Sequence, residues 1–486
     1  MSRITDLIAS QAETRGDTAC FIDAGSGAVL TYDDLALDVA SCQSLDTRHR
    51  LRAGPVGLVI AGPVTFARTF LALLSAGFTI APLDPATTSA GLDHDIRDLR
   101  LTTLVSDRPD LPTSLPTFRP FDWVRPGRPP RITAVSSASV GSVVLRSSGT
   151  TGRRKQILLP ETQLLHTAYE IAQHHELTPD DRGFSPLPLF HVNAEVVGLL
   201  ATLVAGASLV LGNRFHRSAF WLTVGRHRVT WLNAVPAILA ILALEPPPYE
   251  AVRRIRFARS ASAPLAPAVL DRFETTTGIP VLETYGMTEA ASQITANPLS
   301  GPRRKGSVGL PVGCELRVRA GDRTCAPGQA GTVHIRGAGV IPGPLPGGWL
   351  DTGDLGYVDG DGYLFLTGRA DDVINRGGEK LLPRTIEDVA LGDPDVAAAV
   401  AVGVPDPILG SVPVLFAQPT NDCGRRDAGR LADRLRTRCE EQLPGAHRPA
   451  RIDVVESLPL GATGKLSHRL VQAAEADLAR QRWASA

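Results

Sequence analysis

The chain has 486 residues, which is enough for two to four domains with a large hydrophobic core. Its 50 basic and 50 acidic residues give a formal net charge of zero, which argues against a general nucleic-acid binder, because such proteins need a basic surface. The composition is that of ordinary globular domains, with 43% hydrophobic and 21% charged residues. No apolar run reaches the roughly 18 residues that span a membrane, and the first residues do not resemble a secretory signal.

Cysteine and lysine usage adds two further indications. The six cysteines are scattered without a C-x-x-C pair, so we expect neither a disulfide framework nor a zinc site, and a reducing cytoplasm fits. Only four of the 50 basic residues are lysines, and they stand at positions 155, 305, 380 and 465. Because arginine serves as the general surface cation in this chain, a retained lysine is a candidate for a specific role.

The first hundred residues predict a parallel sheet. A helix is expected over 3–16 and a hairpin over 19–31. The apolar run 55–60, the helical spacing of 66–77 and the apolar run 79–83 form a β-α-β unit, which implies parallel strands.

The middle of the chain continues the alternation of helices and strands. Residues 106–131 are expected to be an irregular connection, and 306–336 a β-rich, glycine-punctuated region. The remaining predicted elements are strands at 143–145, 208–211, 229–232 and 279–282 and helices at 164–175, 196–203, 218–224 and 234–244.

A domain boundary is expected near residue 368. The residues beyond it predict a compact α+β module of ordinary domain size. Its expected elements are a helix starting at 387–390, a strand at 396–402, a helix at 427–443 and a strand at 452–455.

A Ser/Thr/Gly-rich segment, 147–155, follows the strand expected at 143–145. Small residues let the backbone wrap around an anion, hydroxyl and N–H groups donate to phosphate oxygens, and Lys155 adds a positive charge. The segment lacks the Gly-Lys pair of a P-loop. A flexible surface linker is the alternative, but the preceding strand and one of only four lysines favour a phosphate site.

Four further segments suit a nucleotide site, and each has a plainer structural alternative. In segment 282–289, the aromatic Tyr285 suits stacking on a purine, and the pair Thr288-Glu289 suits a Mg²⁺–phosphate site. The alternative is an ordinary strand-to-helix turn with Thr288 as its N-cap. Segment 349–356 offers Asp354 to ribose hydroxyls, or it is a hairpin with Asx turns. Segment 368–380 is either a hinge or a plain linker. Segment 458–465 is either a loop that presents the last lysine, Lys465, for a function or an exposed turn.

In this order, these segments resemble five core motifs of the adenylate-forming (ANL) superfamily of acyl-CoA synthetases, peptide-synthetase adenylation domains and luciferases. The resemblance covers about residues 19–469. Segments 259–265, 297–299 and 375–381 are similar to the oxalate–CoA ligase-like branch. That branch tends to carry His where this chain has Asn193 and Ser292, so the acid stays open. His191 stands where amino-acid-activating domains carry Asp, which disfavours a standard amino acid.

The resemblance implies an α/β fold with two domains. A large N-terminal AMP-binding domain of layered α/β subdomains with a β-rich portion (1–368) is joined by a hinge (369–371) to a small mobile α+β domain (372–486). The implied reaction converts a carboxylic acid and ATP, with Mg²⁺, to an acyl-adenylate and pyrophosphate, and then transfers the acyl group to a thiol. The implied partners are a small carboxylic acid, ATP, and CoA or a carrier-protein phosphopantetheine, with no nucleic acid and no membrane span.

The resemblance also assigns site residues. The ATP- or AMP-binding residues are Ser147, Ser148, Gly149, Thr150, Thr151, Gly152, Lys155, Ser262, Ala263, Pro264, Glu283, Thr284, Tyr285, Gly286, Asp354 and Arg369. The catalytic residues are Lys465, His191, Thr288 and Glu289, and Glu289 is also the Mg²⁺ ligand. The hinge residue is Asp371, the thiol tunnel is Gly377, Gly378, Glu379 and Lys380, and the acyl pocket contains Asn193, Ser260 and Ser292. These polar pocket residues favour a small or partly polar acid.

Two other functions remain open at this point. An adenylating enzyme of specialised metabolism would pass the activated group to a carrier protein, an amine or another nitrogen nucleophile. A non-enzymatic ATP-binding protein is the third possibility, and the retention of both Lys155 and Lys465 argues against it.

Overall fold

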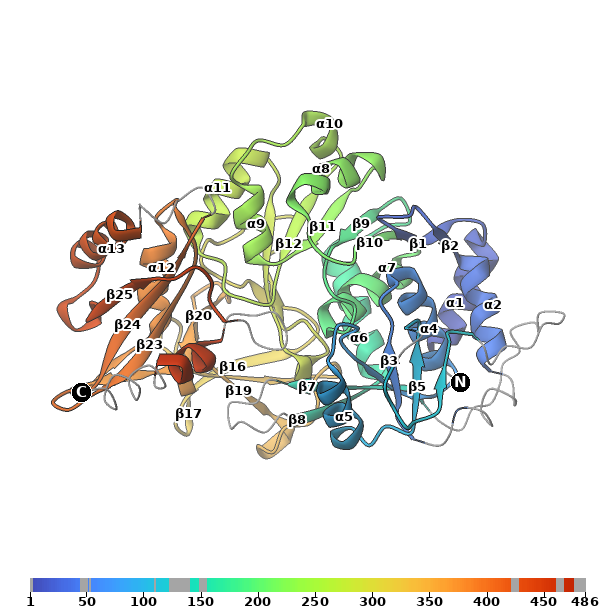
Figure 1. Ribbon diagram of the computed structural model, residues 1–486, viewed down its shortest axis with the longest axis horizontal. Helices are drawn as coiled ribbons and strands as arrows, with labels where there is room; N and C mark the ends of the chain where they lie inside the picture. The colour runs from blue at the N-terminus through green and yellow to red at the C-terminus, as the bar shows by residue number, and fades with distance from the viewer. Residues whose placement is uncertain are drawn as a thin grey trace.

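The computed structural model describes residues 3–43, 51, 54–108, 111–121, 140–147, 155–420, 428–459 and 467–475, whose strands form four sheets (Figure 1). Two predicted site elements, 148–154 and Lys465, lie outside these residues.

The first sheet has the strand order β6-β5-β3-β4-β7-β8. All neighbours in it are parallel except β7 and β8, which form an antiparallel hairpin. Its strands are β3 (Val56–Val59), β4 (Thr79–Pro82), β5 (Thr103–Ser106), β6 (Thr117–Phe118), β7 (Ser142–Ser147) and β8 (Lys155–Pro160), with helices α4 (Pro63–Ser75) and α5 (Ser89–Asp98).

The second sheet has the order β15-β14-β13-β12-β11-β9-β10-β1-β2, and its central strands β13 to β1 are parallel. Its strands are β1 (Ala19–Asp23), β2 (Val29–Thr31), β9 (Arg182–Ser185), β10 (Ser208–Leu211), β11 (Trp231–Ala234), β12 (Phe257–Ser260), β13 (Val281–Tyr285), β14 (Thr295–Ala296) and β15 (Leu310–Pro311). Its helices are α1 (Arg3–Arg15), α2 (Tyr32–Cys42), α6 (Glu161–His174), η1 (Asn193–Leu200), α7 (Ala201–Ala205), α8 (Arg217–Arg226), α9 (Pro236–Leu242), α10 (Tyr249–Val252), α11 (Pro267–Thr277) and η2 (Thr288–Ala290).

Two smaller sheets complete the chain. The β-rich sheet is antiparallel and contains β16 (Glu315–Ala320), β17 (Arg323–Thr324), β18 (Gly331–Arg336), β19 (Leu350–Val358) and β20 (Leu364–Arg369), with the short turn η3 (Pro346–Gly348). The C-terminal sheet contains β21 (Ile374–Arg376), β22 (Glu379–Leu381), β23 (Val396–Asp406), β24 (Gly410–Pro419) and β25 (Arg451–Val454). Its other elements are η4 (Ala370–Asp372), α12 (Pro383–Leu391), α13 (Ala428–Gln442) and η6 (Gly445–His447).

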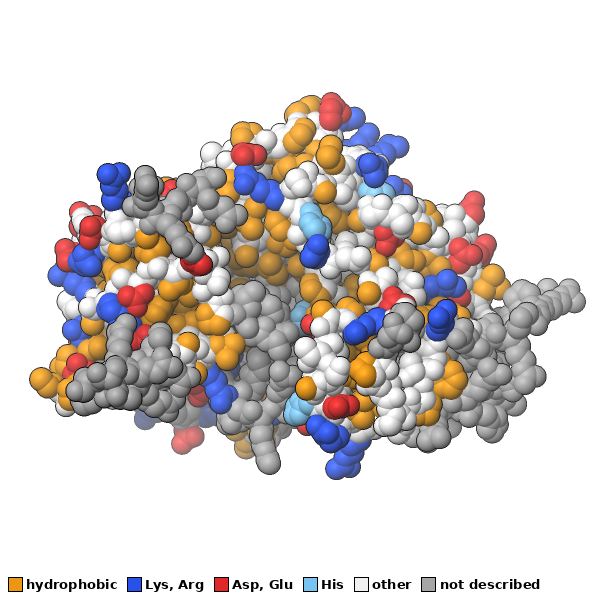
Figure 2. All heavy atoms as spheres, in the orientation of Figure 1, with side chains coloured by type: hydrophobic (Ala, Val, Ile, Leu, Met, Phe, Trp, Pro, Cys, Tyr) orange, Lys and Arg blue, Asp and Glu red, His pale blue; other side chains and the backbone are white. Residues whose placement is uncertain are grey.

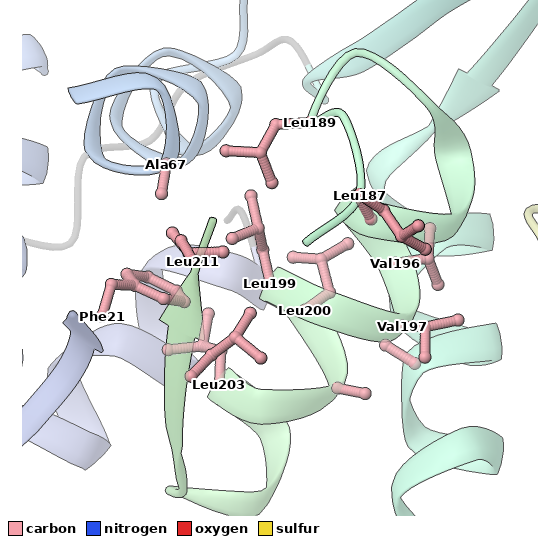
Figure 3. Packing of buried hydrophobic residues seen from close by; sticks show 14 of the residues in the cluster. Phe21, Ala67, Leu187, Leu189, Val196, Val197, Leu199, Leu200, Leu203 and Leu211 are labelled. Carbon is pink, nitrogen blue, oxygen red and sulfur yellow. The ribbon is translucent and has the colours of Figure 1, made fainter. Parts of the chain in front are cut away.

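The main hydrophobic core holds η1 in place between the sheets (Figure 3). Every residue of η1 is buried, and side chains such as Val196 and Leu200 pack among Phe21 of β1, Ala67 of α4 and Leu211 of β10. A helix whose residues from Val196 to Leu200 are all apolar or glycine belongs in a core, and this packing fixes the position of its first residue, Asn193. The helix has π-type hydrogen bonding, a form found often at functional sites.

The predicted elements are confirmed with small shifts of their ends. The expected β-α-β unit is β3–α4–β4, with Val56 paired in parallel to Ile80. Helix α12 starts at Pro383, before the predicted 387, because a proline is well suited to the first turn of a helix. The N-cap of η2 is Met287, without a side-chain hydrogen bond, so the N-cap alternative for Thr288 is wrong.

The surface of the described residues shows one basic hollow and no membrane element. The hollow, of about 980 Å³, lies between α8, α9 and α10, where Figure 2 shows Lys and Arg side chains gathered at the top of the molecule. Two of its arginines, Arg217 and Arg253, are paired with Glu245 and Glu250. None of the described helices is long and apolar enough to cross a membrane.

Candidate active site

The carboxyl ends of neighbouring parallel strands bring the predicted site residues together. Ser260 is the last residue of β12, Tyr285 the last of β13, and Asn233 the penultimate residue of β11, which pairs with β12. Parallel strands of one sheet end at the same edge, and this edge is where α/β proteins bind ligands. These three strands are consecutive in the sheet order. Asp354 and Arg369, which were predicted to bind the same nucleotide as Tyr285, lie instead on the separate β-rich sheet.

Tyr285, Asp354 and Arg369 form one hydrogen-bonded group. The Tyr285 hydroxyl donates to Asp354 Oδ2, and Arg369 Nη1 donates to Asp354 Oδ1 over 3.0 Å. Asp354 and Arg369 are cross-strand partners on β19 and β20. Burial, reinforced by the charge of Asp354, raises the pKa of Tyr285 well above its usual range, so the hydroxyl is a neutral donor. An aromatic ring beside a carboxylate and a guanidinium suits a nucleoside.

Glu283 connects this group to the C-terminal helix α12. Its side chain is buried, and this burial raises its pKa to about 7, although the charge of Arg384 opposes the shift. A backbone hydrogen bond from Leu265 also holds the carboxyl group. Leu265 follows Ala263 and Pro264, both exposed, in the segment predicted to face the adenine.

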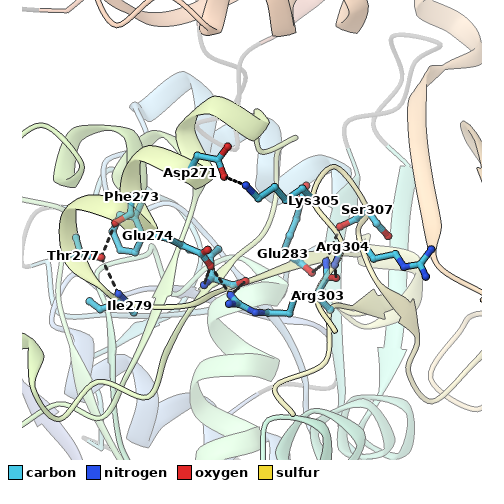
Figure 4. Close-up of polar contacts among 12 residues, drawn as sticks. Asp271, Phe273, Glu274, Thr277, Ile279, Glu283, Arg303, Arg304, Lys305 and Ser307 are labelled. Atoms are coloured by element: carbon cyan, nitrogen blue, oxygen red, sulfur yellow. Dashed lines mark hydrogen bonds and ion pairs between the residues drawn. The ribbon is translucent and has the colours of Figure 1, made fainter. Parts of the chain in front are cut away.

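The loop after β14 is fixed to α11 by ion pairs (Figure 4). Arg303 pairs with Glu274 over 2.5 Å, and Lys305 pairs with Asp271. Glu274 also accepts the backbone N–H of Val281 over 2.7 Å, so the same carboxylate positions the start of β13. The exposed pair with Asp271 gives Lys305 a surface role, unlike the other lysines of the chain that were singled out.

The predicted phosphate segment joins the two strands of the β7–β8 hairpin, in which Ser147 pairs with Lys155. The connecting residues 148–154 lie outside the described part of the chain. The hairpin is anchored at Arg146, which pairs with Asp95 of α5, and both side chains are largely buried. Helix η2, which carries Thr288 and Glu289, lies against β7 and β8. Lys155 is exposed.

Two predicted site residues occupy strained backbone, one assigned to the nucleotide (Ser262) and one to the acyl pocket (Ser292). Ser262 has a φ of 76° and Ser292 a φ of 99°, in the left-handed region that non-glycine residues rarely adopt. Such strain persists only where the surroundings enforce it, and it concentrates at functional sites. Asn193 Nδ2 donates to Ser262 Oγ over 3.3 Å, which connects η1 to this segment. Gly286 packs directly on the Ser292 backbone, with no room for a Cβ.

The remaining predicted residues near this edge are also placed. His191 is half-buried beside Phe190, with ring centroids 4.4 Å apart, and its carbonyl accepts the Glu195 N–H at the start of η1. Thr284 Oγ1 donates to the Ser260 carbonyl over 3.1 Å.

The chain changes sheets at the predicted hinge. Strand β20 ends at Arg369, η4 follows with Asp371 exposed, and β21 begins the C-terminal sheet. Gly377 and Gly378 form the tip of the β21–β22 hairpin with φ values of 58° and 92°, and the next residues, Glu379 and Lys380, are exposed. The described contacts of this tip, to Leu409 and His447, are within the C-terminal region.

Sequence reasoning missed four buried polar residues at the same strand ends. Arg259, Asn233, Gln293 and Glu195 are each at most 3% exposed. Burial raises the pKa of Glu195 well above its usual range, which favours the protonated form of this carboxyl. These residues could have been found as polar positions inside otherwise apolar runs of the sequence. Because arginine is abundant in this chain, Arg259 did not stand out as such a position.

Two family models match the chain in the order of its two predicted domains. "AMP-binding enzyme" matches residues 8–343, and "AMP-binding enzyme C-terminal domain" matches residues 385–465.

Characterised relatives and solved structures agree with these matches. A sulfoacetate–CoA ligase from Cupriavidus necator is 36% identical over 95% of this chain and 95% of its own length. An oxalate–CoA ligase from Arabidopsis thaliana is 35% identical over 86% of this chain and 87% of its own. The o-succinylbenzoate CoA synthetase of Bacillus subtilis, solved with its acyl-adenylate, has a TM-score of 0.82 and 25% identity over 96% of this chain and 97% of its own. The chain therefore belongs to the AMP-binding enzyme family of adenylate-forming enzymes and is an AMP-forming, acyl-CoA synthetase-like ligase.

Proposed function

We propose that the chain adenylates a small, polar carboxylic acid at the carboxyl ends of β12 and β13 and then transfers the acyl group to CoA. The observation that carries the proposal is the group formed by Tyr285, Asp354 and Arg369, whose tyrosine ends the strand β13 that leads directly to Gly286 and the Ser292 turn. A nucleoside site and a polar acid pocket are thus adjacent. The acids in the relatives' names, sulfoacetate and oxalate, are also small and polar.

In the first step, a carboxylate oxygen attacks the α-phosphorus of ATP, and the bond from that phosphorus to the bridging oxygen breaks, so pyrophosphate leaves. This step joins two anions, so the site must supply positive charge and orientation. Lys465 is proposed to bridge the carboxylate and the α-phosphate. The 147–155 segment, with its hydroxyls and Lys155, is proposed to hold the departing pyrophosphate.

The residues on η2 fit a magnesium ion. Thr288 supplies a hydroxyl and Glu289 a carboxylate, and hard oxygen donors of this kind are what Mg²⁺ prefers. Their helix lies against the two strands that carry the phosphate segment. Bound there, Mg²⁺ would neutralise phosphate charge.

The nucleoside is proposed to lie over β13 and β19. The Tyr285 ring would stack on the adenine, with the segment that contains Ser262, Ala263 and Pro264 on the other side. Asp354 would accept the ribose hydroxyls, and Arg369 orients this carboxylate from 3.0 Å away.

In the second step, the thiol sulfur of CoA attacks the acyl carbon, the bond to the adenylate oxygen breaks, and AMP leaves while the thiol proton is lost. The C-terminal domain is proposed to turn about Asp371 between the steps. This turn would remove Lys465 and bring the Gly377–Lys380 tip to the pocket, with His191 and Gly286 along the passage. The change of sheet at η4 and the exposed, glycine-rich tip support such a motion.

The test is pyrophosphate release with a panel of acids, with and without CoA. Lys465→Ala should abolish release while ATP binding persists. Lys305→Ala is the matched control, because Lys305 forms an exposed ion pair with Asp271, and it should leave the rate unchanged. Unchanged release by Lys465→Ala would remove Lys465 from the mechanism. Release without any effect of CoA would instead assign the acceptor to a carrier protein or a nitrogen nucleophile.

A further inference from the structure

A fully buried arginine stands at the acyl side of the strand ends. Arg259, the penultimate residue of β12, is 1% exposed. Its Nη1 donates to Asn193 Oδ1 over 3.3 Å and to Asn233 Oδ1 over 3.4 Å, and its Nη2 donates to Gln293 Oε1 over 3.3 Å. All three acceptors are neutral amides. Among the described residues, no carboxylate forms an ion pair with this guanidinium, and its Nε has no hydrogen-bond partner.

The charge of Arg259 is therefore not neutralised by the described protein. Burial lowers the pKa of Arg259 to about 9, which still leaves the group charged near pH 7. Burial, together with the charge of Arg259, lowers the pKa of the nearby His175 well below its usual range, and an imidazole cannot neutralise a cation. A buried charge held only by dipoles is an unfavourable arrangement that an arriving anion relieves.

The arginine also decides how the surrounding amides are turned. A guanidinium has donors only, so the oxygen atoms of Asn193 and Gln293 must face it and their NH₂ groups must face away. Asn233 Nδ2 fixes Asn193 further by donating to the same oxygen over 3.1 Å. The Asn193 NH₂ group is thereby directed at Ser262 of the predicted acyl pocket.

Several donors at this place lack an acceptor among the described residues. They are Arg259 Nε, Gln293 Nε2 and the hydroxyl of Ser260, which are all buried. Buried polar groups in folded proteins nearly always have partners, so orphaned donors beside a predicted pocket indicate a ligand rich in acceptor oxygens. The strained Ser262 accepts from Asn193, and Gln293 directly follows the strained Ser292.

We propose that Arg259 is the specificity residue for an acid that carries a second, negatively charged oxygen group in addition to the carboxylate that is adenylated. The inference rests on the proposed function and deepens it. Arg259 acts as a positioning residue: it supplies a fixed positive charge behind the pocket and turns the N–H groups of Asn193 and Gln293 toward the second anion. The chemical class is a short dicarboxylate or a sulfonate-bearing carboxylate.

The alternative is that Arg259 only holds the strand ends together. The two roles differ in what a substitution does to different acids. A purely structural arginine lowers activity on all acids alike, whereas a specificity residue lowers it for acids with the second charge. Matched pairs isolate that charge: malonate with its monomethyl ester, and sulfoacetate with propionate.

The experiment measures acid-dependent ATP–pyrophosphate exchange, which reports adenylation alone and needs no CoA. The wild type should favour the doubly charged member of a pair at least tenfold in kcat/KM. Arg259→Met should lose at least 30-fold on that member, mainly through KM, and less than threefold on the singly charged one. Arg259→Lys, which keeps the charge, should restore part of the preference. Arg256→Gln is the control, because Arg256 is paired with Asp181 and should leave the ratio unchanged.

Each outcome decides between the proposals. A wild type that exchanges acids without preferring the second charge overturns the inference and leaves the proposed function standing, and this comparison needs no variant to fold. Equal losses by Arg259→Met on both members of a pair also overturn it. If no acid supports exchange, the proposed function fails. The role of Arg259 is then tested by calorimetric titration of malonate and sulfoacetate into the wild type and Arg259→Met. Binding that requires Arg259 supports the inference, and the absence of binding to the wild type overturns it.

Discussion

Replacing Gly286 with Ala would place a methyl group against the backbone of the strained Ser292 turn. The new Cβ would lie 1.4 Å from the Ser292 carbonyl oxygen and 3.0 Å from Gln293 Cα. Ordinary contact begins near 3.4 Å, so the turn must move by about 2 Å relative to β13. Because the obstacle is backbone, no side-chain rotation can relieve it. The displaced residues include two that are predicted to border the acid.

The size of the effect follows from that displacement. Overpacking of this kind destabilises a protein by roughly 1–3 kcal/mol. A misplacement of about 1 Å in a site that orients reactants can lower the rate about 100-fold. We therefore expect Gly286→Ala to reduce ATP–pyrophosphate exchange by at least about 100-fold, with a smaller loss of stability that leaves the protein folded at 25 °C.

The assay combines exchange rates with unfolding by denaturant. Gly360→Ala is the matched control, because a Cβ at Gly360 meets no atom within 4 Å and its φ is not positive. It should change the free energy of unfolding by less than about 0.5 kcal/mol and leave exchange unchanged. If Gly286→Ala behaves like this control, the contact between Gly286 and the Ser292 turn is refuted, and with it the argument that this turn shapes the acid pocket.

Three further predictions concern the charges around the site. Asp354→Asn removes the carboxylate that accepts from Tyr285 and Arg369, so the KM for ATP should rise about 10- to 100-fold in initial-rate measurements while the KM for the acid changes little. Burial raises the pKa of Glu283 from 4.5 to about 7 and so favours its protonated form in the folded protein. The free energy of unfolding should therefore fall by about 3 kcal/mol as pH rises from 4.5 to 8. In Glu283→Gln this fall should be absent, as measured by denaturant unfolding across the same pH range. Burial opposes the charge of His468, but Glu387, 2.6 Å away, and Asp372 raise its pKa overall, so its stabilisation is complete below pH 6.5 and is lost as pH rises through the raised value. His468→Gln should therefore lower the free energy of unfolding by about 1–2 kcal/mol at pH 6 and change it little at pH 9.

The fold was predictable because its signals are local. The apolar run 55–60, the helical spacing after it and the next apolar run identify β3, α4 and β4 without knowledge of any contact. The π-type hydrogen bonding of η1 could not be predicted in this way, because an eight-residue stretch that is buried on all sides has no period that distinguishes i+4 from i+5 bonding. The position of Asn193, the first residue of η1, could not be predicted either, because it depends on how the helix packs against β1, β10 and α4.

The residues predicted for the nucleotide stand out in the sequence more clearly than those around the proposed acid pocket. Tyr285 and Asp354 are 69 residues apart in the sequence, but each lies in a recognisable motif, and the structure brings them into contact. The acid pocket depends on residues whose importance comes only from burial. In a chain with only four lysines, attention to lysine led to Lys155 and Lys465, whereas Arg259 is one of many arginines, and the resemblance of segment 259–265 did not indicate that this side chain is buried without a carboxylate partner.

The acid pocket departs from the rules that hold elsewhere in the chain, and the departures coincide. The largely buried Arg146 is paired with Asp95, but the fully buried Arg259 meets only amide oxygens. Left-handed backbone is otherwise assigned mainly to glycines, but two serines adopt it here. Each departure costs stability on its own, so their occurrence around one space is not explained by folding. An anion with several acceptor oxygens would remove the electrostatic cost by pairing with Arg259 and would satisfy the unpaired donors. Under the proposal, the electrostatic cost of the buried Arg259 charge and the unpaired donors therefore favour the binding of a doubly charged acid over that of a singly charged one.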